Sequence, residues 1–209
     1  DNNSLTVSIG NGMPLVVGAK AFQLAVTTSP TDQLRVQVGY VTGSKVTVLG
    51  DNALPGGELG GLLEFRASTL DRAQNSLGRI AIGIAETFNA QHKLGQDSAG
   101  NMGDNFFTVA PAVVGKAVTN DPASTTAVTA TITDTSRLTH SDYKVSYDGT
   151  KYTVTRMSDK TPIDINPYPQ TQPQVIDGIA FDISGAAAQG DYFMVRPTIG
   201  GAAQFNLAL

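Results

Sequence analysis

The 209-residue sequence contains no cysteine, which excludes disulfide bonds, thiolate catalysis and zinc sites built from cysteine. It also lacks a cluster of basic residues, and its 14 Lys and Arg against 18 Asp and Glu give a net charge of −4. Such a chain is a poor candidate for binding nucleic acid or acidic lipid, so we expect neither partner. No apolar run approaches the roughly 20 residues that a membrane-spanning helix needs, so we expect no membrane contact either.

The N-terminus lacks the features of a cleaved secretory signal. Asp1–Ser4 is polar, with no basic region and no apolar region after it. The chain instead starts abruptly in strand-like sequence. We therefore expect it to be a central fragment of a longer protein.

The first fifty residues alternate between apolar and polar side chains, the period of β-strands. Gly10-Asn11-Gly12 interrupts the alternation near the start, and Asn-Gly predicts a hairpin turn because both residues accept a positive φ. Val36, Val38 and Tyr40 continue the alternation further along. Residues 4–49 are thus predicted to form β-hairpins.

From Glu58 the apolar period becomes helical, and we expect one long helix that ends near Leu94 with Gly95 as its C-terminal cap. Its apolar positions are spaced alternately four and three residues apart, which is the seam of a coiled coil with one arginine in it. The predicted seam consists of Leu59, Leu63, Arg66, Leu70, Ala73, Leu77, Ile80 and Ile84, and Phe88 continues it after a slip.

A helix of about 37 residues is roughly 55 Å long, and a seam on it requires helical partners. This sequence predicts no second helix of comparable length, so we expect those partners to lie outside it. Gly78 and Gly83 inside the helix suggest close approach of a neighbouring helix. We expect the isolated chain to be monomeric, with residues 4–49 covering part of the seam. An aspartate at Leu70 or Leu77 is then expected to cost several kcal/mol.

Acidic residues change type along the chain. All three glutamates lie between Glu58 and Glu86, and every later acid is aspartate, which favours turns over helices. The second half is therefore predicted to be all-β, with strands at 106–109, 128–133, 143–147, 152–156 and 192–196. Asp148-Gly149 and Asp177-Gly178 are predicted hairpin turns, the first pairing Val145 with Tyr152. Residues 161–173 contain four prolines and are predicted to form a surface loop.

The sequence offers few residues for chemistry. His92 and His140 are the only histidines, and we expect His92 to stabilise the helix end rather than bind metal. Residues 97–105 are acidic and glycine-rich, but they lack the alternation and terminal glutamate of a calcium loop. The glycine-rich stretch at 56–61 lacks the spacing of a phosphate-binding loop. We expect turns at both places.

Three aspartates and three tyrosines are further candidates for a binding role. The aspartates Asp177, Asp182 and Asp191 could form a carboxylate pair, although solvated turns are the commoner role. The tyrosines Tyr143, Tyr147 and Tyr152 could form a platform for sugars, although cross-strand packing is the commoner use. We therefore predict no catalytic residue, no cofactor and no metal, and no enzymatic activity.

Three stretches resemble a known family. Residues 56–107 ("GGELGGLLEFRASTLDRAQNSLGRIAIGIAETFNAQHKLGQDSAGNMGDNFF") resemble the central segment of the first hook-associated protein family, which forms the hook–filament junction of bacterial flagella. The lead-in "LTVSIGNGMPLVVG" (Leu5–Gly18) and "IDGIAFDISGAAAQGDYFMVRPT" (Ile176–Thr198) are also similar to that family, in the same order.

The resemblance implies a structural protein that is exported through the flagellar type III apparatus without a cleaved signal peptide and assembles outside the cell. Its implied partners are further copies of itself in a ring, the hook protein and the second junction protein. In the family, helices from both chain ends pack on the central helix, and those ends are absent from this sequence. The β-rich half is implied to be an outer domain.

The expected fold is α+β, with β-hairpins packed on one long central helix and a mainly antiparallel all-β domain after it. The expected domains are a hairpin-plus-helix domain at 1–104, part of the inner coiled-coil domain, and an outer domain at 105–209. The expected function is a structural role in the junction ring. The alternative is a secreted carbohydrate-binding or adhesive β-module with the helix as a stalk, which predicts exposed aromatic and acidic side chains on one β face.

Overall fold

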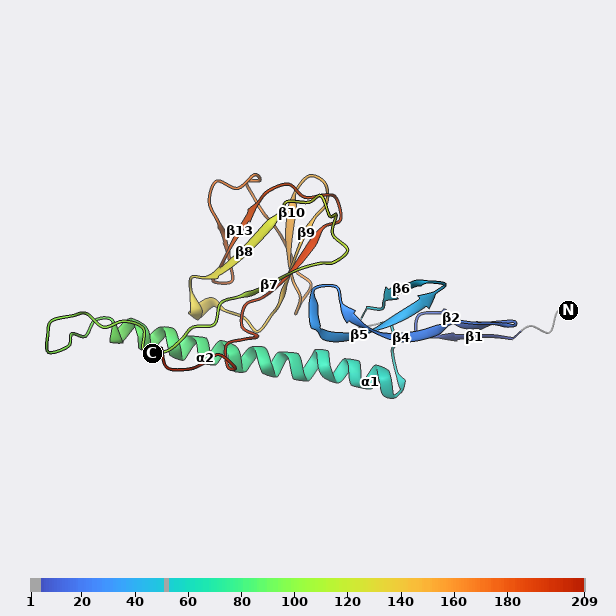
Figure 1. The fold of residues 1–209 in the computed structure, drawn as a ribbon, viewed down its shortest axis with the longest axis horizontal. Coiled ribbons are helices and arrows are strands. Elements are labelled where there is room, and N and C mark those ends of the chain that lie inside the picture. The colour runs from blue at the N-terminus through green and yellow to red at the C-terminus, as the bar shows by residue number, and fades with distance from the viewer. Residues whose placement is uncertain (1–4, 51–52, 209) are drawn as a thin grey trace. The chain divides into compact units, whose positions relative to one another are not determined.

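The structure is a computed structural model that describes residues 5–50 and 53–208, with the backbone alone for residues 33 and 34 (Figure 1). Ser4, the first residue of the predicted alternating segment, lies outside the described residues. The chain divides into two compact units, Asp1–Asp71 and Arg72–Leu209.

The first unit contains two small antiparallel sheets of three strands each. They are formed by β1 (Thr6–Ile9), β2 (Met13–Val17) and β3 (Lys20–Ala21), and by β4 (Gln23–Ser29), β5 (Asp32–Thr42) and β6 (Lys45–Val48). The predicted Asn11-Gly12 turn is confirmed, because Ile9 pairs with Met13 across it. Tyr40 of β5 joins the two sheets by donating its hydroxyl hydrogen to the carbonyl of Pro14 at 2.5 Å.

Three helical elements follow: α1 (Gly57–Phe65), a π-turn η1 (Arg66–Leu70) and α2 (Asp71–His92). The π-turn was not predicted, since an apolar period alone does not report one inserted residue. Within the first unit, Arg66 donates to the carbonyl of Val36 at 2.8 Å, and Arg35 forms an ion pair with Asp71 at 2.7 Å. The predicted packing of hairpins against the helix is therefore made by long polar side chains.

The helix ends slightly before the predicted Leu94, and Gly95 is not its left-handed cap. The last turn closes when Lys93 donates to the carbonyl of Asn89 at 3.0 Å. Gly95 is absent from the glycines with positive φ, and its carbonyl accepts from Gly103 at 2.9 Å. Gly95 instead begins a small hairpin in which Gln96 bridges Met102. Gly95 nevertheless donates its N–H to the carbonyl of His92 at 3.0 Å, so it caps the last turn without the left-handed conformation of a typical glycine cap.

The second unit contains α2 and a β-domain of two antiparallel sheets. The larger has the order β11-β10-β9-β14-β7 and the smaller β12-β13-β8. The strands are β7 (Val113–Lys116), β8 (Ala127–Ile132), β9 (Tyr143–Tyr147), β10 (Tyr152–Arg156), β11 (Pro162–Asp164), β12 (Gln174–Ile176), β13 (Ile179–Ser184) and β14 (Tyr192–Arg196), with one 3-10 turn, η2 (Thr135–Arg137). The predicted α+β class is confirmed.

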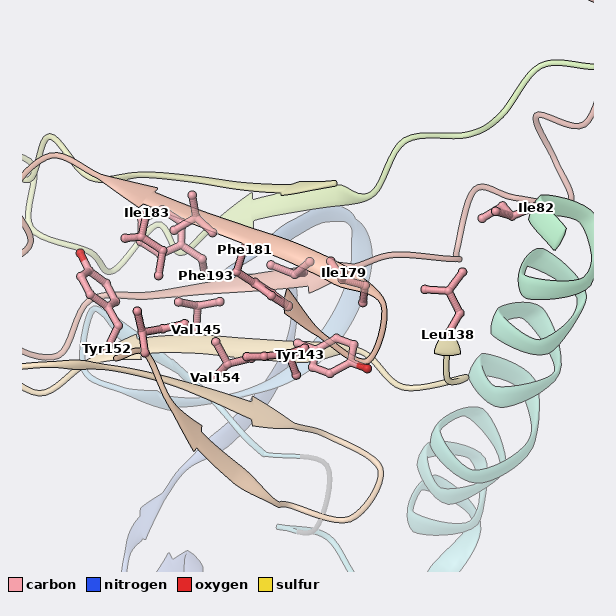
Figure 2. Close-up of a cluster of buried hydrophobic side chains, with 14 residues drawn as sticks. Ile82, Leu138, Tyr143, Val145, Tyr152, Val154, Ile179, Phe181, Ile183 and Phe193 are labelled. Carbon is pink, nitrogen blue, oxygen red and sulfur yellow. The ribbon is translucent and has the colours of Figure 1, made fainter. Parts of the chain in front are cut away.

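The core of the second unit lies between its two sheets and extends to α2 (Figure 2). Tyr143, Val145 and Val154 from the larger sheet are fully buried with Ile179 and Phe181 from the smaller one. Figure 2 shows Leu138 between this core and Ile82 of α2, and both side chains belong to the same apolar cluster. Helix α2 is therefore part of the core that supports the β-domain.

The strand predictions for the second half are confirmed in part. The Asp177-Gly178 hairpin forms as predicted, with Ile176 paired to Ile179 and a positive φ at both turn residues. The Asp148-Gly149 hairpin is shifted, because Tyr152 pairs with Tyr147 and not with Val145. Its turn is longer by two residues.

The side chain of Asp148 explains the longer turn. Its carboxylate accepts hydrogen bonds from the backbone of Thr150 at 2.7 Å and of Lys151 at 2.9 Å, which favours a four-residue loop. These contacts lower the pKa of Asp148 to about 2, led by the hydrogen bond from the Lys151 backbone. A two-residue turn leaves no room for that arrangement.

Two other strand assignments need correction. Residues 106–109 do not form a named strand, and only Phe107 makes a bridge, with Leu207. Residues 161–173 are not wholly a surface loop, because β11 pairs with β10 and Ile165 is 2% exposed. In both cases the distant chain segment that pairs or covers these residues decided the outcome.

Candidate functional site

Most of the predicted seam lies open to solvent. The exposed fractions are 60% for Leu77, 55% for Ile80 and 52% for Ile84, and Leu59, Leu70, Ala73 and Phe88 are exposed as well. Leu63 and Arg66 are half-buried, and Arg66 is the residue that bonds to β5. The seam therefore presents a largely exposed apolar stripe, and within the first unit Arg66 is the seam residue that bonds to a strand.

The solvent-facing apolar groove on α2 lies within this stripe. Its lining residues are Ile80, Gly83, Ile84, Thr87, Phe88 and Gln91. A Cβ added at Gly83 meets nothing within 4 Å. The neighbouring helix that Gly83 was expected to admit is therefore not supplied by the described residues.

A second stripe on α2 is buried, and the sequence reasoning missed it. Its members are spaced three and four residues apart and consist of Asn75, Gly78, Ile82, Ala85 and Asn89. Only Ile82 and Ala85 are apolar side chains that contribute to a hydrophobic pattern. A signal was nevertheless present, because asparagine and glycine repeated at helical spacing inside a helix are unfavourable unless they make specific contacts.

At the N-terminal end of the buried stripe, Asn75 binds the loop that precedes β9. The amide of Asn75 donates to the carbonyl of His140 at 3.1 Å and to the carboxylate of Asp142 at 3.0 Å. Arg79 donates to the carbonyl of Leu138 at 3.1 Å. These bonds satisfy carbonyls that the closely approaching helix hides from water.

Gly78 admits a chain segment to the surface of the helix. A Cβ added there lies 1.8 Å from the carbonyl oxygen of Thr198, closer than any real contact. The expected close approach is therefore real at Gly78, but its partner is the segment after β14 and not a helix. A hydrophobic period cannot distinguish these two partners.

Asn89 binds the backbone of the segment that leads into the β-domain. Its side-chain oxygen accepts from the backbone of Phe106 at 2.9 Å and of Phe107 at 2.8 Å, and its amide donates to the carbonyl of Phe107 at 2.8 Å. Asn89 is 1% exposed. The returning end lies beside this point, because Thr108 donates to the carbonyl of Asn206 at 2.8 Å.

Aromatic rings surround the same point. Phe88 lies 5.0 Å from Phe106 and 5.1 Å from Phe107 between ring centroids, and Phe107 stacks on Phe205 at 4.7 Å. His92 stacks on Phe88 and lies tilted against Phe106, and its Nδ1 lies 2.7 Å from the carbonyl oxygen of Asp104. These contacts fix the position of His92, and its expected role at the helix end stays a prediction.

The three aspartates that could have formed a carboxylate pair serve different parts of the β-domain. Asp177 accepts from Arg156 at 2.8 Å and from the hydroxyl of Tyr143 at 2.7 Å. Burial tends to raise the pKa of Asp177, but the bonds from Arg156 and Tyr143 outweigh it and hold the pKa below the ordinary value. Asp191 is 2% exposed and accepts from the backbones of Asp121 and Ala188, whereas Asp182 is exposed.

The predicted turn at 97–105 is supported by Asp97. Its carboxylate accepts from the backbones of Ala99 and Asn101, each at 2.8 Å, and from the side chain of Asn101. Over residues 5–50 and 53–208 there is no group of three or more His, Asp or Glu side chains that could hold a metal ion. Within the same described ranges, none of the helices is both long and apolar enough to cross a membrane.

The tyrosines do not form an open platform. Tyr143 and Tyr152 are fully buried, and Tyr147 is half-buried against Tyr152 at 4.7 Å. Burial raises the pKa of Tyr152 to about 12, which agrees with a position inside the core. Cross-strand packing explains these rings, and the carbohydrate-binding alternative loses the feature on which it depended.

Comparison with known proteins gives a consistent result. Residues 1–107 match the family described as flagellar hook-associated protein FlgK helical domain, and residues 117–197 match the flagellar hook-associated protein 1 D2-like domain. Flagellar hook-associated protein 1 of Escherichia coli (strain K12) is 35% identical over 198 residues, which cover 94% of this chain and 36% of that protein. The same protein of Salmonella typhimurium is 34% identical over 208 residues, which cover 99% and 37%.

A solved structure agrees over the whole chain. The flagellar hook junction protein FlgK from Burkholderia pseudomallei superposes with a TM-score of 0.89 at 37% identity, covering 100% of this chain and 39% of that one. The chain thus spans 36–39% of the relatives that it matches. Because one family match alone covers residues 1–107 of 209, the chain belongs to the FlgK family of flagellar hook-associated proteins.

Proposed function

We propose that this chain is the middle part of a structural protein that forms the junction ring between the hook and the filament of a bacterial flagellum. The observation that carries the proposal is the exposed seam of α2 in a chain that spans 36–39% of its relatives. The family match supplies the flagellar context. The role is structural and not catalytic.

The seam has the chemistry of a helix-packing surface. Leu70, Leu77, Ile80 and Ile84 are each more than half exposed, and full burial of such a side chain contributes about 1.5–3 kcal/mol relative to exposure. Covering the stripe with partner helices therefore yields several kcal/mol. We propose that helices from the remainder of the parent protein cover all nine predicted positions, from Leu59 to Phe88.

The β-domain is proposed to be the outer part of the subunit. The segment that enters it bonds to Asn89 through Phe106, the segment that leaves it pairs with Thr108 through Asn206, and its core includes Ile82 of α2. We propose the boundary between inner and outer domains at 104/105, shortly before the end of the first family match at 1–107 and ahead of the second at 117–197. The division of the structure at Asp71 and Arg72 groups α2 with the β-domain instead, because α2 carries the buried stripe.

The proposed partners are further copies of the same protein in a ring, the hook protein and the second hook–filament junction protein. The proposed location is the outside of the cell, reached without a cleaved signal peptide. These assignments rest on the family and on the flagellar names of the relatives.

Complementation tests the proposed function. The gene for the parent protein is deleted in a motile bacterium, and swimming and filament protein in the medium are measured. We expect loss of filaments with flagellin released into the medium, and recovery of both on return of the gene. Normal filaments in the deletion strain contradict the proposal.

A parent protein with Leu77→Asp and Ile84→Asp in the seam is compared with a control that carries Glu86→Lys, an exposed position outside the seam. We expect the seam variant to fail to restore filaments and the control to restore them. Restoration by both contradicts the role of the seam.

A further inference from the structure

The exposed charges of the first unit are segregated by sign. Among its described residues, the exposed basic side chains are Lys20 and Lys45 on the strands, and the exposed acidic ones are Glu58 and Glu64 on α1. The other described charges, such as Arg35 and Asp71, are half-buried. The strands of the unit therefore carry its exposed cations and α1 carries its exposed anions.

The cations border an exposed apolar face of the sheet β4-β5-β6. The register pairs Leu24 with Tyr40, Val26 with Val38, and Thr28 with Val36, so these side chains share one face. Val26 is 81% exposed and Val36 is 57% exposed. We call this surface the valine face.

Both lysines lie near the Tyr40 end of the valine face. Lys45 pairs with Thr42, which points to the same side as Tyr40 because side chains alternate along a strand. Lys20 places its Nζ 5.0 Å from the ring centroid of Phe22, and that ring stacks on Tyr40 at 5.8 Å.

The helical segment after α1 approaches the opposite face at Asp71, the first residue of α2. Arg35, which precedes Val36 and so points to the other side of β5, forms the ion pair with Asp71. The unit's own helical segment is thus engaged away from the valine face.

An acidic apolar stripe on α1 complements the valine face. Glu58, Leu62 and Phe65 are spaced four and three residues apart and so lie on one side of the helix. Leu62 is 59% exposed and Phe65 is 56% exposed. None of the three belongs to the predicted seam, so helices packed on the seam do not require this stripe.

We propose that the valine face of one subunit binds the Glu58–Leu62–Phe65 stripe of the next subunit, with Lys45 beside Glu58. The proposal rests on the proposed function, since it requires the parent protein to assemble with itself. Two different surfaces of the same chain meet, and such a head-to-tail contact closes into a ring when its rotation allows closure. Opposite charges at the edge of the contact set its register and disfavour pairing of two valine faces.

Cysteine cross-linking tests the contact in the full parent protein. The 209 residues contain no cysteine, so Lys45→Cys and Glu58→Cys introduce a defined pair once any cysteine elsewhere has been changed to serine. The variant replaces the parent gene in the deletion strain, hook–filament structures are isolated and oxidised, and products are separated without reductant. We expect a ladder of multimers from the double variant and none from either single variant.

The control pair is Lys45→Cys with Glu86→Cys, which moves the second thiol to an exposed position on α2. We expect no ladder from it. A swimming strain that gives no ladder from the Lys45–Glu58 pair overturns this contact while leaving the junction role intact. An internal disulfide within one chain, or a dimer from Lys45→Cys alone, also overturns it. Failure of the unmodified parent gene to restore filaments counts against the proposed function instead.

Charge reversal gives a second readout that does not depend on oxidation. Lys45→Glu and Glu58→Lys are each expected to reduce swimming several-fold, and the double variant is expected to recover it. Both side chains are exposed, so neither change disturbs a buried contact. Additive losses in the double variant contradict the pairing.

Discussion

Ile82 and Ile84 lie two residues apart on α2, and yet Ile82 is 1% exposed and Ile84 is 52% exposed. Each belongs to a continuous stripe with alternating spacings of three and four residues. On α2 the exposed stripe consists of Ala73, Leu77, Ile80, Ile84 and Phe88, whereas the buried stripe contains two asparagines, a glycine and an alanine besides Ile82. Within this chain the more hydrophobic side of the helix is thus the more exposed one.

This inversion shows what each stripe does. The buried stripe holds chain segments of irregular structure, whose carbonyls and N–H groups need polar partners and close approach. The exposed stripe has the regular apolar composition that suits another helix. The two glycines agree with this division, since Gly78 lies under Thr198 and Gly83 faces open space.

The largest expected difference comes from placing an aspartate on each stripe. In the 209-residue chain, Ile82→Asp buries a charge in the core and is expected to cost about 4 kcal/mol or more of unfolding free energy. Leu77→Asp, at 60% exposure, is expected to change the unfolding free energy by only about 0.5 kcal/mol. The value of several kcal/mol expected from the sequence for Leu77 is replaced by this smaller one, because Leu77 is 60% exposed. Urea unfolding of both variants measures the difference, and equal losses refute the two-stripe interpretation.

The glycines offer the next contrast. Gly78→Ala is expected to destabilise the chain by about 3 kcal/mol, since the added methyl group meets the backbone of Thr198. Gly83→Ala in open space is expected to stabilise it by up to about 1 kcal/mol, the difference in helix propensity. In the full parent protein, Gly83→Ala is expected to lose this advantage where a partner helix lies close. Thermal unfolding gives both values, and a stabilising Gly78→Ala disproves the close approach.

Asn89→Ala is expected to cost about 2 kcal/mol, because it leaves the N–H groups of Phe106 and Phe107 without their acceptor. Hydrogen exchange at these two amides is expected to accelerate more than exchange in β9 and β10. Glu86→Ala, at an exposed position on the same helix, serves as the control and is expected to leave both amides unchanged. Uniform acceleration across the β-domain contradicts a local role for Asn89.

The smallest expected effect is the pH dependence of unfolding that Asp177 causes. Asp177 lies in the β-domain and not on α2, so the measurement reports a contact that neither stripe makes. The pKa of Asp177 lies below the ordinary value of 3.8, so its ionised form stabilises the fold above about pH 4, and this contribution is lost as the pH falls through the lowered pKa. Asp177→Asn keeps a residue that tolerates positive φ and is expected to cost about 1–2 kcal/mol at pH 6. The cost is expected to shrink towards pH 2 in denaturant titrations, and a cost independent of pH argues against the ionic contact with Arg156.

Local sequence was sufficient for much of the fold. The first turn has a positive φ at Gly10 and Gly12 and the second at Asp177 and Gly178, and few residue types other than glycine, asparagine and aspartate accept this conformation. The long helix and its apolar stripe follow from a period that spans many residues. Such features depend on the backbone preferences of residues that are neighbours in the sequence. These preferences can therefore be recognised without knowledge of the tertiary contacts.

Tertiary contacts decided the remainder. The turn after Tyr147 is four residues long because Asp148 caps it, and the chain after α2 returns in a hairpin in which Gly103 donates to the carbonyl of Gly95. The valine face and the acidic stripe on α1 became visible only when strand register placed their residues on particular sides.

By itself, the sequence determined that a long apolar helix lies between β-rich segments and requires partners. Only the tertiary structure decided which side of that helix is already occupied. The physical reason is that Asn75, Gly78 and Asn89 contribute through hydrogen bonds and close approach, which depend on distant segments such as 106–107 and 198. A hydrophobic pattern records the tendency of a side chain to avoid water, but not the identity of the group that covers it.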